Sequence, residues 1–308
     1  MQSIKIIRTV LRDILPEPRY CQSHEHIWIS PEMLGGSSPV LPIDSFQASE
    51  NELKCYRSLG GEMLVDAQPV NAGGSPRVLA ELSAAADVSV IASTGFHKLC
   101  FYRDDSPVFT KSAGELSEEF CKDIRDGRCG IIKVAADRDT FRGRYAVLHL
   151  AAASAALKTG AHLICHVEQG ADPFDIIGFY GEHGVSPESL ILCHCDRAVP
   201  DSAVLLSVLR HGVYLEFDTV ARPKYHSDGY EIKLIQTVCD AGFSDRLLLG
   251  LDTTRQRLRS YGDPSAPGLD YIITRFIPQL IGSGIPAGTV DMFMKHNPAG
   301  ALSFTPEQ

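Results

Sequence analysis

Hydrophobic positions along this chain follow two alternating patterns. Short apolar runs rich in β-branched residues predict strands, and longer segments with apolar residues at helical spacing predict helices. The predicted strands cover residues 20–23, 63–66, 88–92, 130–134, 162–166, 190–194, 213–217 and 247–251. The predicted helices cover about residues 45–58, 75–86, 112–126, 142–159, 172–182, 201–210, 229–241 and 270–282, with a ninth at 287–294.

This alternation indicates an α/β fold in which βαβ units build a parallel sheet. Eight such units fit a closed (β/α)8 TIM barrel better than an open sheet, and we expect one domain over residues 1–308. The Gly- and Pro-rich segments 31–42 and 261–268 follow the first and last strands, so they are expected as loops of the catalytic face. A two-domain doubly wound protein is the alternative, but no GxGxxG turn follows an early strand.

Composition narrows the function classes. The 308 residues carry 29 Lys and Arg against 38 Asp and Glu, a net charge of −9, which disfavours nucleic acid and anionic membranes as partners. The first 15 residues do not resemble a signal peptide, and no apolar run reaches the roughly 20 residues of a membrane span. Nine Cys without a CxxC pair indicate reduced thiols, so we predict a cytoplasmic protein.

Polar residues gather where the predicted strands end. His24 and His26 lie two residues apart in a strand, so both rings should face the same side. His166, His194 and Asp252 each follow an apolar run, at the strand ends where barrels place their chemistry. A purely structural role would require burying all five polar groups with a partner for each, so a metal site is the better interpretation.

Lys133 lies inside the fourth predicted strand, where a cationic amine is costly to bury. It could reach the rim of the barrel or pair with Asp137 or Asp139. The functional alternative is that burial deprotonates the amine and carbon dioxide carboxylates it. The resulting carbamate would be an anionic bridge between two metal ions.

Together these residues resemble the amidohydrolase superfamily, and most closely its phosphotriesterase-like branch. The resemblance is carried by CQSHEHIW, VDAQPVNAGGSPRVL, STGFHK, GIIKVA, HVEQG, LCHCD, LLGLDTTR and the C-terminal segment from DYIITRF to ALSF. It extends over nearly the whole chain and implies a metal-dependent hydrolase acting on ester bonds.

The resemblance also implies a role for each predicted ligand. His24, His26 and Asp252 would bind a buried metal ion, and His166 and His194 a more exposed one. Carboxylated Lys133 and a hydroxide would bridge the two ions. These are most simply two Zn²⁺ ions, and Mn²⁺ or Co²⁺ also suit this ligand set.

In the implied reaction the bridging hydroxide attacks a carbonyl or phosphoryl centre, and Asp252 is the catalytic residue that accepts its proton. No GxSxG motif points to a serine nucleophile. Cys193 and Cys195 flank His194, so strand alternation predicts that both point toward the helices as inert thiols, and Cys165 likewise beside His166.

Several polar residues on predicted catalytic-face loops indicate a small anionic substrate. Any one of them could instead be a solvated loop residue. The DTTR and RSYG segments and the KY pair resemble members that open sugar lactones or phosphorylated sugar lactones. The candidate substrate-binding residues are His97, Lys98, Lys224, Tyr225 and Arg255.

Other functions stay open. A phosphotriesterase or another carboxyl or phosphate ester hydrolase could use the same metal pair. A mononuclear deaminase of the superfamily would not need Lys133, and a non-catalytic metal-binding barrel is a third alternative. By analogy with the branch, a homodimer is expected.

Overall fold

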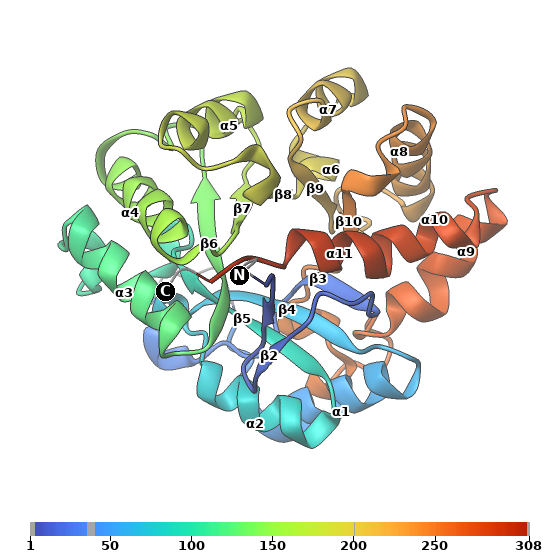
Figure 1. Cartoon of the computed structure of the whole chain (residues 1–308). Coiled ribbons are helices and arrows are strands. Elements are labelled where there is room, and N and C mark those ends of the chain that lie inside the picture. The colour runs from blue at the N-terminus through green and yellow to red at the C-terminus, as the bar shows by residue number, and fades with distance from the viewer. Residues whose placement is uncertain (1–3, 36–40, 200, 307–308) are drawn as a thin grey trace.

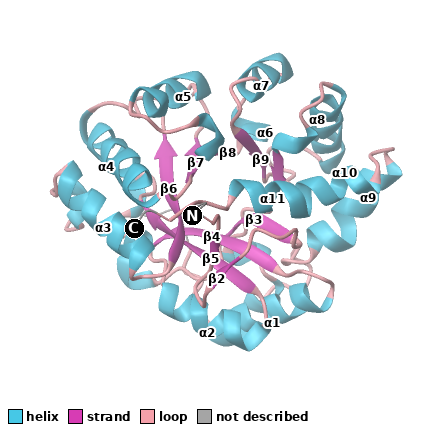
Figure 2. Cartoon of the chain, viewed as in Figure 1, coloured by secondary structure: helices cyan, strands magenta, loops and turns pink. Residues whose placement is uncertain are grey.

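Eight parallel strands form the centre of the computed structural model, which describes residues 4–35, 41–199 and 201–306. They pair in chain order, and helices surround them (Figures 1 and 2). The predicted (β/α)8 barrel is therefore confirmed. The strands are β3 (Cys21–Glu25), β4 (Met63–Pro69), β5 (Ser89–Gly95), β6 (Cys129–Ala136), β7 (Leu163–Val167), β8 (Leu190–Cys193), β9 (Tyr214–Phe217) and β10 (Leu247–Leu249).

The predicted helices all form, and many begin at a polar capping residue. Ser112 and Glu115 make a reciprocal capping box at the third helix, which satisfies backbone N–H groups that would otherwise lack acceptors. The helices are α1 (Phe46–Ser58), α2 (Pro76–Ala86), α3 (Ala113–Arg125), α4 (Gly143–Thr159), α5 (Pro173–Glu182), α6 (Cys195–Ala198), α7 (Ser202–Leu209), α8 (Asp228–Asp240), α9 (Ile277–Gly282), α10 (Ala287–Asp291) and α11 (Asn297–Ala301).

Four elements differ from the sequence prediction. Strands β1 (Ile7–Arg8) and β2 (Asp13–Ile14) form an antiparallel pair that is too short to leave a periodic signal. Helix α6 is a single turn. The ninth predicted helix continues through α10 to the end of α11, because the widened turn at Met292–His296 joins the two without a break.

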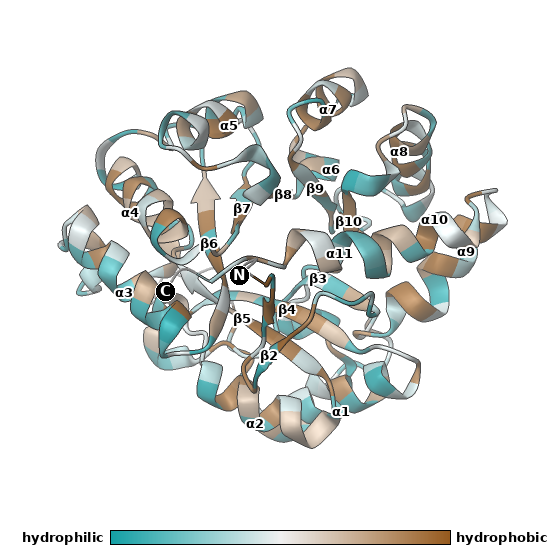
Figure 3. Cartoon of the chain, viewed as in Figure 1, coloured by the Kyte–Doolittle hydropathy of each residue, from teal (hydrophilic) through white to brown (hydrophobic). Residues whose placement is uncertain are grey.

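The interior of the barrel is apolar below the strand ends, and apolar residues also follow the strands in Figure 3. Its N-terminal end is closed by Ile7 from β1, by Ala301 at the end of α11 and by Leu302 after it. This packing leaves the C-terminal end as the place where polar side chains enter. The inward-facing apolar residues include Met63, Val65, Ile91, Ile131, Ile164, Ile191 and Leu248.

The barrel closes where β10 meets β3. The backbone N–H of Asp252 donates to the carbonyl oxygen of His24 at 2.9 Å. Gly250 permits this approach, since a Cβ there would lie 2.9 Å from both the Cβ and the carbonyl oxygen of His24. The seam of the barrel therefore brings together two of the predicted metal ligands.

The structure describes one of the predicted catalytic-face loops only in part. The predicted loop 31–42 includes residues 36–40, which lie outside the described residues. Among the helices that are described, none combines the length and the apolar character needed to cross a membrane.

Gly95, at the end of β5, packs against the backbone of Lys133, so substituting it tests how far the fold around the site depends on close strand packing. It has a φ of 96°, and an added Cβ would lie 2.0 Å from the carbonyl oxygen of Lys133. Gly95→Ala should lower the free energy of unfolding by about 3 kcal/mol or more, combining backbone strain with overpacking. Denaturant unfolding measures the change.

The matched control is Gly60→Ala. Gly60 has a φ of 99° but nothing within 4 Å of an added Cβ, so only the backbone strain of about 1–2 kcal/mol remains. Equal destabilisation by the two substitutions would show that contact with Lys133 is not the constraint.

Candidate metal centre

The six predicted ligands converge at the C-terminal end of the barrel. His26 Nε2 lies 3.4 Å from Asp252 Oδ1. His24 Nε2 lies 3.2 Å from the amine of Lys133, and His194 Nε2 lies 2.8 Å from His166 Nδ1. The structure thus brings together the six residues predicted as metal ligands.

A bulge in β3 sets the position of His24. Cys21 pairs with Met63 and Glu25 with Asp66, so β3 has one residue more than β4 over this stretch. The extra residue changes the alternation of the strand. Cys21 and His24 therefore both reach the barrel interior although they are three residues apart.

His194 and Asp252 are held by unusual backbone rather than by regular strand. Their φ angles are 63° and 47°, in the left-handed region that residues other than Gly seldom adopt. His194 follows the last residue of β8 and precedes α6. Such strain persists where surrounding structure enforces it, and it is common at functional sites.

This backbone turn corrects the prediction for Cys193. Strand alternation through His194 places Cys193 toward the helices, but it packs inside the barrel and its Sγ lies 3.0 Å from Glu216 Oε2. The reason is that His194 leaves the strand by its positive φ instead of continuing the alternation. Cys165 and Cys195 pack in the outer core, as predicted.

Two buried carboxylates at the end of β9 orient the imidazoles. His24 Nδ1 donates to Glu216 Oε2 at 3.0 Å, and His194 Nδ1 donates to Asp218 Oδ1 at 2.6 Å. Since a carboxylate only accepts, Nδ1 of each ring carries a proton and Nε2 faces the centre. The sequence analysis missed this pair, although two acidic residues at alternating positions of an apolar strand were a signal.

The pKa values of the rings follow from these contacts. Burial and Lys133 lower the pKa of His24, but hydrogen bonds to Asp218 and Glu216 outweigh them and raise it to about 9. The carboxylates therefore make this ring more basic and a better donor to a cation. Burial lowers the pKa of His26 to about 4 and that of His166 to about 4, so both rings are neutral near pH 7.

Lys133 is fully buried, and within the described parts of the chain no carboxylate oxygen lies within 4.0 Å of its amine. The alternative pairings are not seen: Asp137 accepts from the backbone of Arg138, and Asp139 lies 3.9 Å from Arg142. This buried amine has no counter-ion. Once it carries a carbamate, its oxygens together with the imidazole nitrogens and the carboxylate of the centre form a donor set that fits divalent cations.

Asp252 is flanked by two arginines that the sequence analysis did not single out. Its Oδ2 lies 3.1 Å from Arg222 and 3.3 Å from Arg197. Burial would raise the pKa of Asp252, but Arg222, His26 and Arg197 hold it well below its usual range. The carboxylate is therefore ionised, as a metal ligand must be. Its basicity is low, so its role as proton acceptor stays a prediction.

A cavity of about 240 Å³ opens above these side chains. Two predicted substrate-binding residues, His97 and Lys224, line it together with Arg222. Burial holds the pKa of His97 well below its usual range, so this ring is neutral. The other lining residues are His24, His26, Ile29, Gln68, Phe101, His166, His194, Asp252, Thr253 and Thr254.

The other three predicted substrate-binding residues do not line this cavity. The amine of Lys98 lies 2.5 Å from Glu168, whose Oε2 is also 3.4 Å from His166 Nε2. Arg255 lies 2.8 Å from Asp44. The ring of Tyr225 is contacted by Lys224 and by Arg197, at 4.6 and 4.8 Å from its centre. Lys98 and Arg255 thus already have protein counter-ions.

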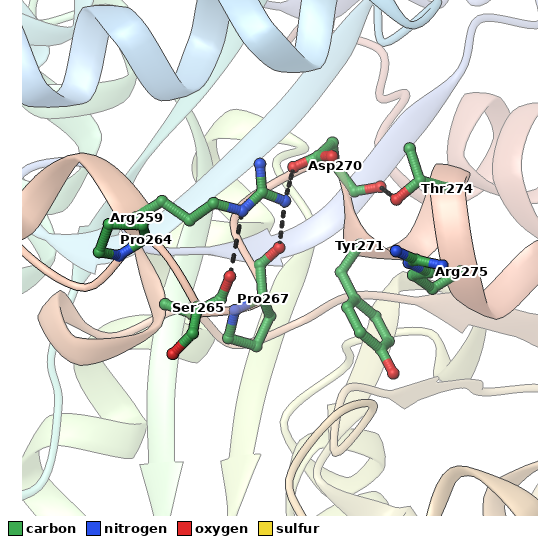
Figure 4. A pocket seen from close by; sticks show the side chains of 9 residues that line it. Arg259, Pro264, Ser265, Pro267, Asp270, Tyr271, Thr274 and Arg275 are labelled. Atoms are coloured by element: carbon green, nitrogen blue, oxygen red, sulfur yellow. Dashed lines mark hydrogen bonds and ion pairs between the residues drawn. The ribbon is translucent and has the colours of Figure 1, made fainter.

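A larger cavity of about 490 Å³ lies between the loop after β10 and the helix that follows (Figure 4). None of the six predicted ligands lines it. Its Arg259 is held by Asp270 and by the carbonyl oxygens of Ala266 and Pro267. We place the chemistry in the smaller cavity, because five of the predicted ligands line it and none lines the larger one.

Comparisons with known proteins group this chain with hydrolases. Residues 18–302 match the model of the Phosphotriesterase family. The phosphotriesterase homology protein of Escherichia coli strain K12 is 27% identical over 292 residues, which cover 91% of this chain and 96% of that protein. N-acetyltaurine hydrolase of Bos taurus is 27% identical over 277 residues, covering 84% and 78% respectively.

Solved structures share the fold. A lactonase from Listeria monocytogenes superimposes with a TM-score of 0.88 at 23% identity, covering 97% of this chain and 99% of its own. The Escherichia coli phosphotriesterase homology protein, solved with phosphate in its active site, has a TM-score of 0.84 at 25% identity, with coverages of 94% and 100%.

Asp218→Asn tests the role of the carboxylates. The amide keeps the size of the side chain but weakens the bond that fixes the proton of His194 on Nδ1. We expect zinc affinity, measured by competition with a chromophoric chelator, to fall by about 10–100-fold. Asp105→Asn, at an exposed position, is the control. Unchanged affinity of Asp218→Asn would exclude this orienting role.

Proposed function

Because this chain belongs to the phosphotriesterase family and is a hydrolase, we propose that it opens a small lactone ring, of a sugar or a phosphorylated sugar. The observation that carries the proposal is the cavity of about 240 Å³. Five of the six predicted ligands line it, and the sixth, Lys133, lies 3.2 Å from the lining residue His24. Lys224 and Arg222 add cationic groups to its wall. Drug-sized ligands occupy roughly 300–1,000 Å³, so a compact anionic substrate fits better than one with a long acyl chain.

We further propose that the centre holds two divalent ions, most simply zinc, with Lys133 carboxylated between them. His24, His26 and Asp252 would hold one ion, and His166 and His194 the other. Such ions lower the pKa of bound water and polarise the substrate oxygen. The support is the donor set: imidazole nitrogens oriented by carboxylates, an ionised Asp252, and a buried amine without a counter-ion.

The chain's own groups would orient the substrate. The ammonium of Lys224 and the guanidinium of Arg222 attract a phosphate or carboxylate end. Arg222 is also bound to Asp252, so its charge is partly neutralised, and Lys224 is the freer cation. His97 is neutral and would supply a ring nitrogen for hydrogen bonding to sugar hydroxyls. These contacts would hold the lactone carbonyl over the centre.

A second candidate is hydrolysis of a small amide that carries an anionic group. It is favoured because a relative at 27% identity over 277 residues is named N-acetyltaurine hydrolase. An amide and a lactone both present a carbonyl carbon for attack, and Lys224 would serve an anionic end of either. A neutral phosphotriester would leave Lys224 without a counter-ion, so this third option is less favoured.

A substrate panel decides between these candidates. Metal-loaded protein would be assayed with sugar lactones, their phosphorylated forms, N-acetyl amino sulfonates and a phosphotriester. We expect the highest kcat/KM for a lactone and a further increase when it is phosphorylated. Turnover of the amides alone would support the second candidate, and turnover of the phosphotriester alone would overturn both.

Lys133→Ala tests the bridge. It should remove at least one equivalent of bound zinc per chain and lower kcat/KM by about 100-fold or more, because it removes a proposed ligand shared by both ions. Metal analysis and steady-state kinetics measure the two effects. Lys295→Ala, at a partly exposed lysine of Met292–His296 that pairs with Asp291, is the control. One tightly held ion per chain, with no loss of metal or activity in Lys133→Ala, would instead favour a mononuclear site.

Lys224→Met tests recognition of the anion. It should raise KM for a phosphorylated lactone by about tenfold or more, since hydrogen bonds to charged groups contribute about 1.5–3 kcal/mol. KM for the unphosphorylated lactone should change little. Lys233→Met, at an exposed position of α8, removes the same charge outside the cavity. Equal effects of Lys224→Met on both lactones would contradict the assignment.

A further inference from the structure

A second group of possible metal ligands lies beside the centre. It consists of Asp196 in α6, Glu231 in the first turn of α8 and His226 in the loop before that helix. One potential ligand atom from each lies within 4.8 Å of the others. None of the three belongs to the six predicted ligands, and the proposed hydrolysis does not use them.

The carboxylates of this group are buried with oxygens left unpaired. Glu231 has no exposed surface, and Asp196 is 2% exposed. Over the residues that the structure describes, both oxygens of Glu231 and Oδ1 of Asp196 lack a hydrogen-bond donor. His226 Nε2 lies 3.1 Å from Glu231 Oε2, but the two atoms are not aligned as a hydrogen bond. Unpaired oxygens of this kind are rare in a protein interior.

Burying these two carboxylates as anions would cost still more free energy. Within the described ranges no Lys or Arg nitrogen lies within 4.0 Å of either carboxylate. The neighbouring Arg197 extends to Asp218 and Asp252 instead. Burial, and then the charge of Asp196, raise the pKa of Glu231 well above its usual range. Two buried carboxylates beside one imidazole must be neutralised by a proton or by a cation between them.

We propose that Asp196, His226 and Glu231 bind a third divalent metal ion, separate from the two-metal centre. One imidazole and two carboxylates are donors that zinc and manganese accept. An ion about 2.0–2.2 Å from each donor needs donors no more than about 4.4 Å apart, so a small contraction from the present geometry suffices. His226 is partly exposed, with 12% of its side-chain surface accessible, and provides the route of entry.

The proposed ion would organise the wall of the substrate cavity. Asp196 Oδ2 accepts from the backbone N–H groups of Asp218 at 3.0 Å and Thr219 at 2.6 Å. The same ligand therefore links the ion to the start of the loop between β9 and α8. That loop carries Arg222 and Lys224, while Glu231 and His226 hold its far end. The ion would thus be structural, fixing a loop that lines the cavity.

The test compares metal content in two backgrounds. The full chain is loaded with Zn²⁺ or, separately, with Mn²⁺, desalted and analysed for metal per chain. Glu231→Gln should hold one equivalent less than the wild type. A His24→Asn/His26→Asn variant, which impairs the two-metal centre, should keep one equivalent that disappears when Glu231→Gln is added. The result is therefore independent of whether the proposed function is correct.

Two further measurements guard against misfolding. His226→Asn should lose the same equivalent, and Glu188→Gln, at an exposed carboxylate, should lose none. In the His24→Asn/His26→Asn background, a chelator should lower Tm, and it should no longer do so after Glu231→Gln. The same metal content with and without Glu231→Gln would overturn the proposal. Asp196 and Glu231 would then share a proton.

Discussion

The meeting of β10 with β3 is the constraint on which the rest of the structure depends. It is the last contact needed to close the barrel, and it is made by the backbone of two residues whose side chains belong to the candidate centre, His24 and Asp252. Gly250 keeps the two strands close enough for that contact. Closing the fold and assembling the site are therefore one event, and a barrel that failed to close would have no centre.

A layer of carboxylates behind the imidazoles completes the site. Glu216 and Asp218 accept hydrogen bonds from Nδ1 of His24 and His194, so Nε2 of each ring points inward before any ion arrives. Asp196 then holds the backbone of Asp218. His194 is thus positioned by Asp218 and Asp218 by Asp196, so little rearrangement of His194 would accompany metal binding.

The sequence predicts the repeating part of this structure well, because strands, helices and strand-end ligands follow periodicity. It predicts less well what depends on a local break in periodicity. The bulge before His24 and the positive φ of His194 each interrupt the inside–outside alternation of a strand. The positive φ of His194 is the reason that Cys193 lies inside the barrel. Loop charges are the other limit: Lys98 and Arg255 have counter-ions that lie 70 and 211 residues away in the chain.

The left-handed backbone at His194 and Asp252 has an evolutionary consequence. At these positions Gly or Asn would relieve strain, so selection for stability alone would replace both residues. Only selection for the side chains opposes that drift. A descendant that lost its chemistry would be expected to change here first, while its apolar barrel interior stayed the same. These two positions would therefore distinguish working descendants of this chain from barrels that keep only the fold.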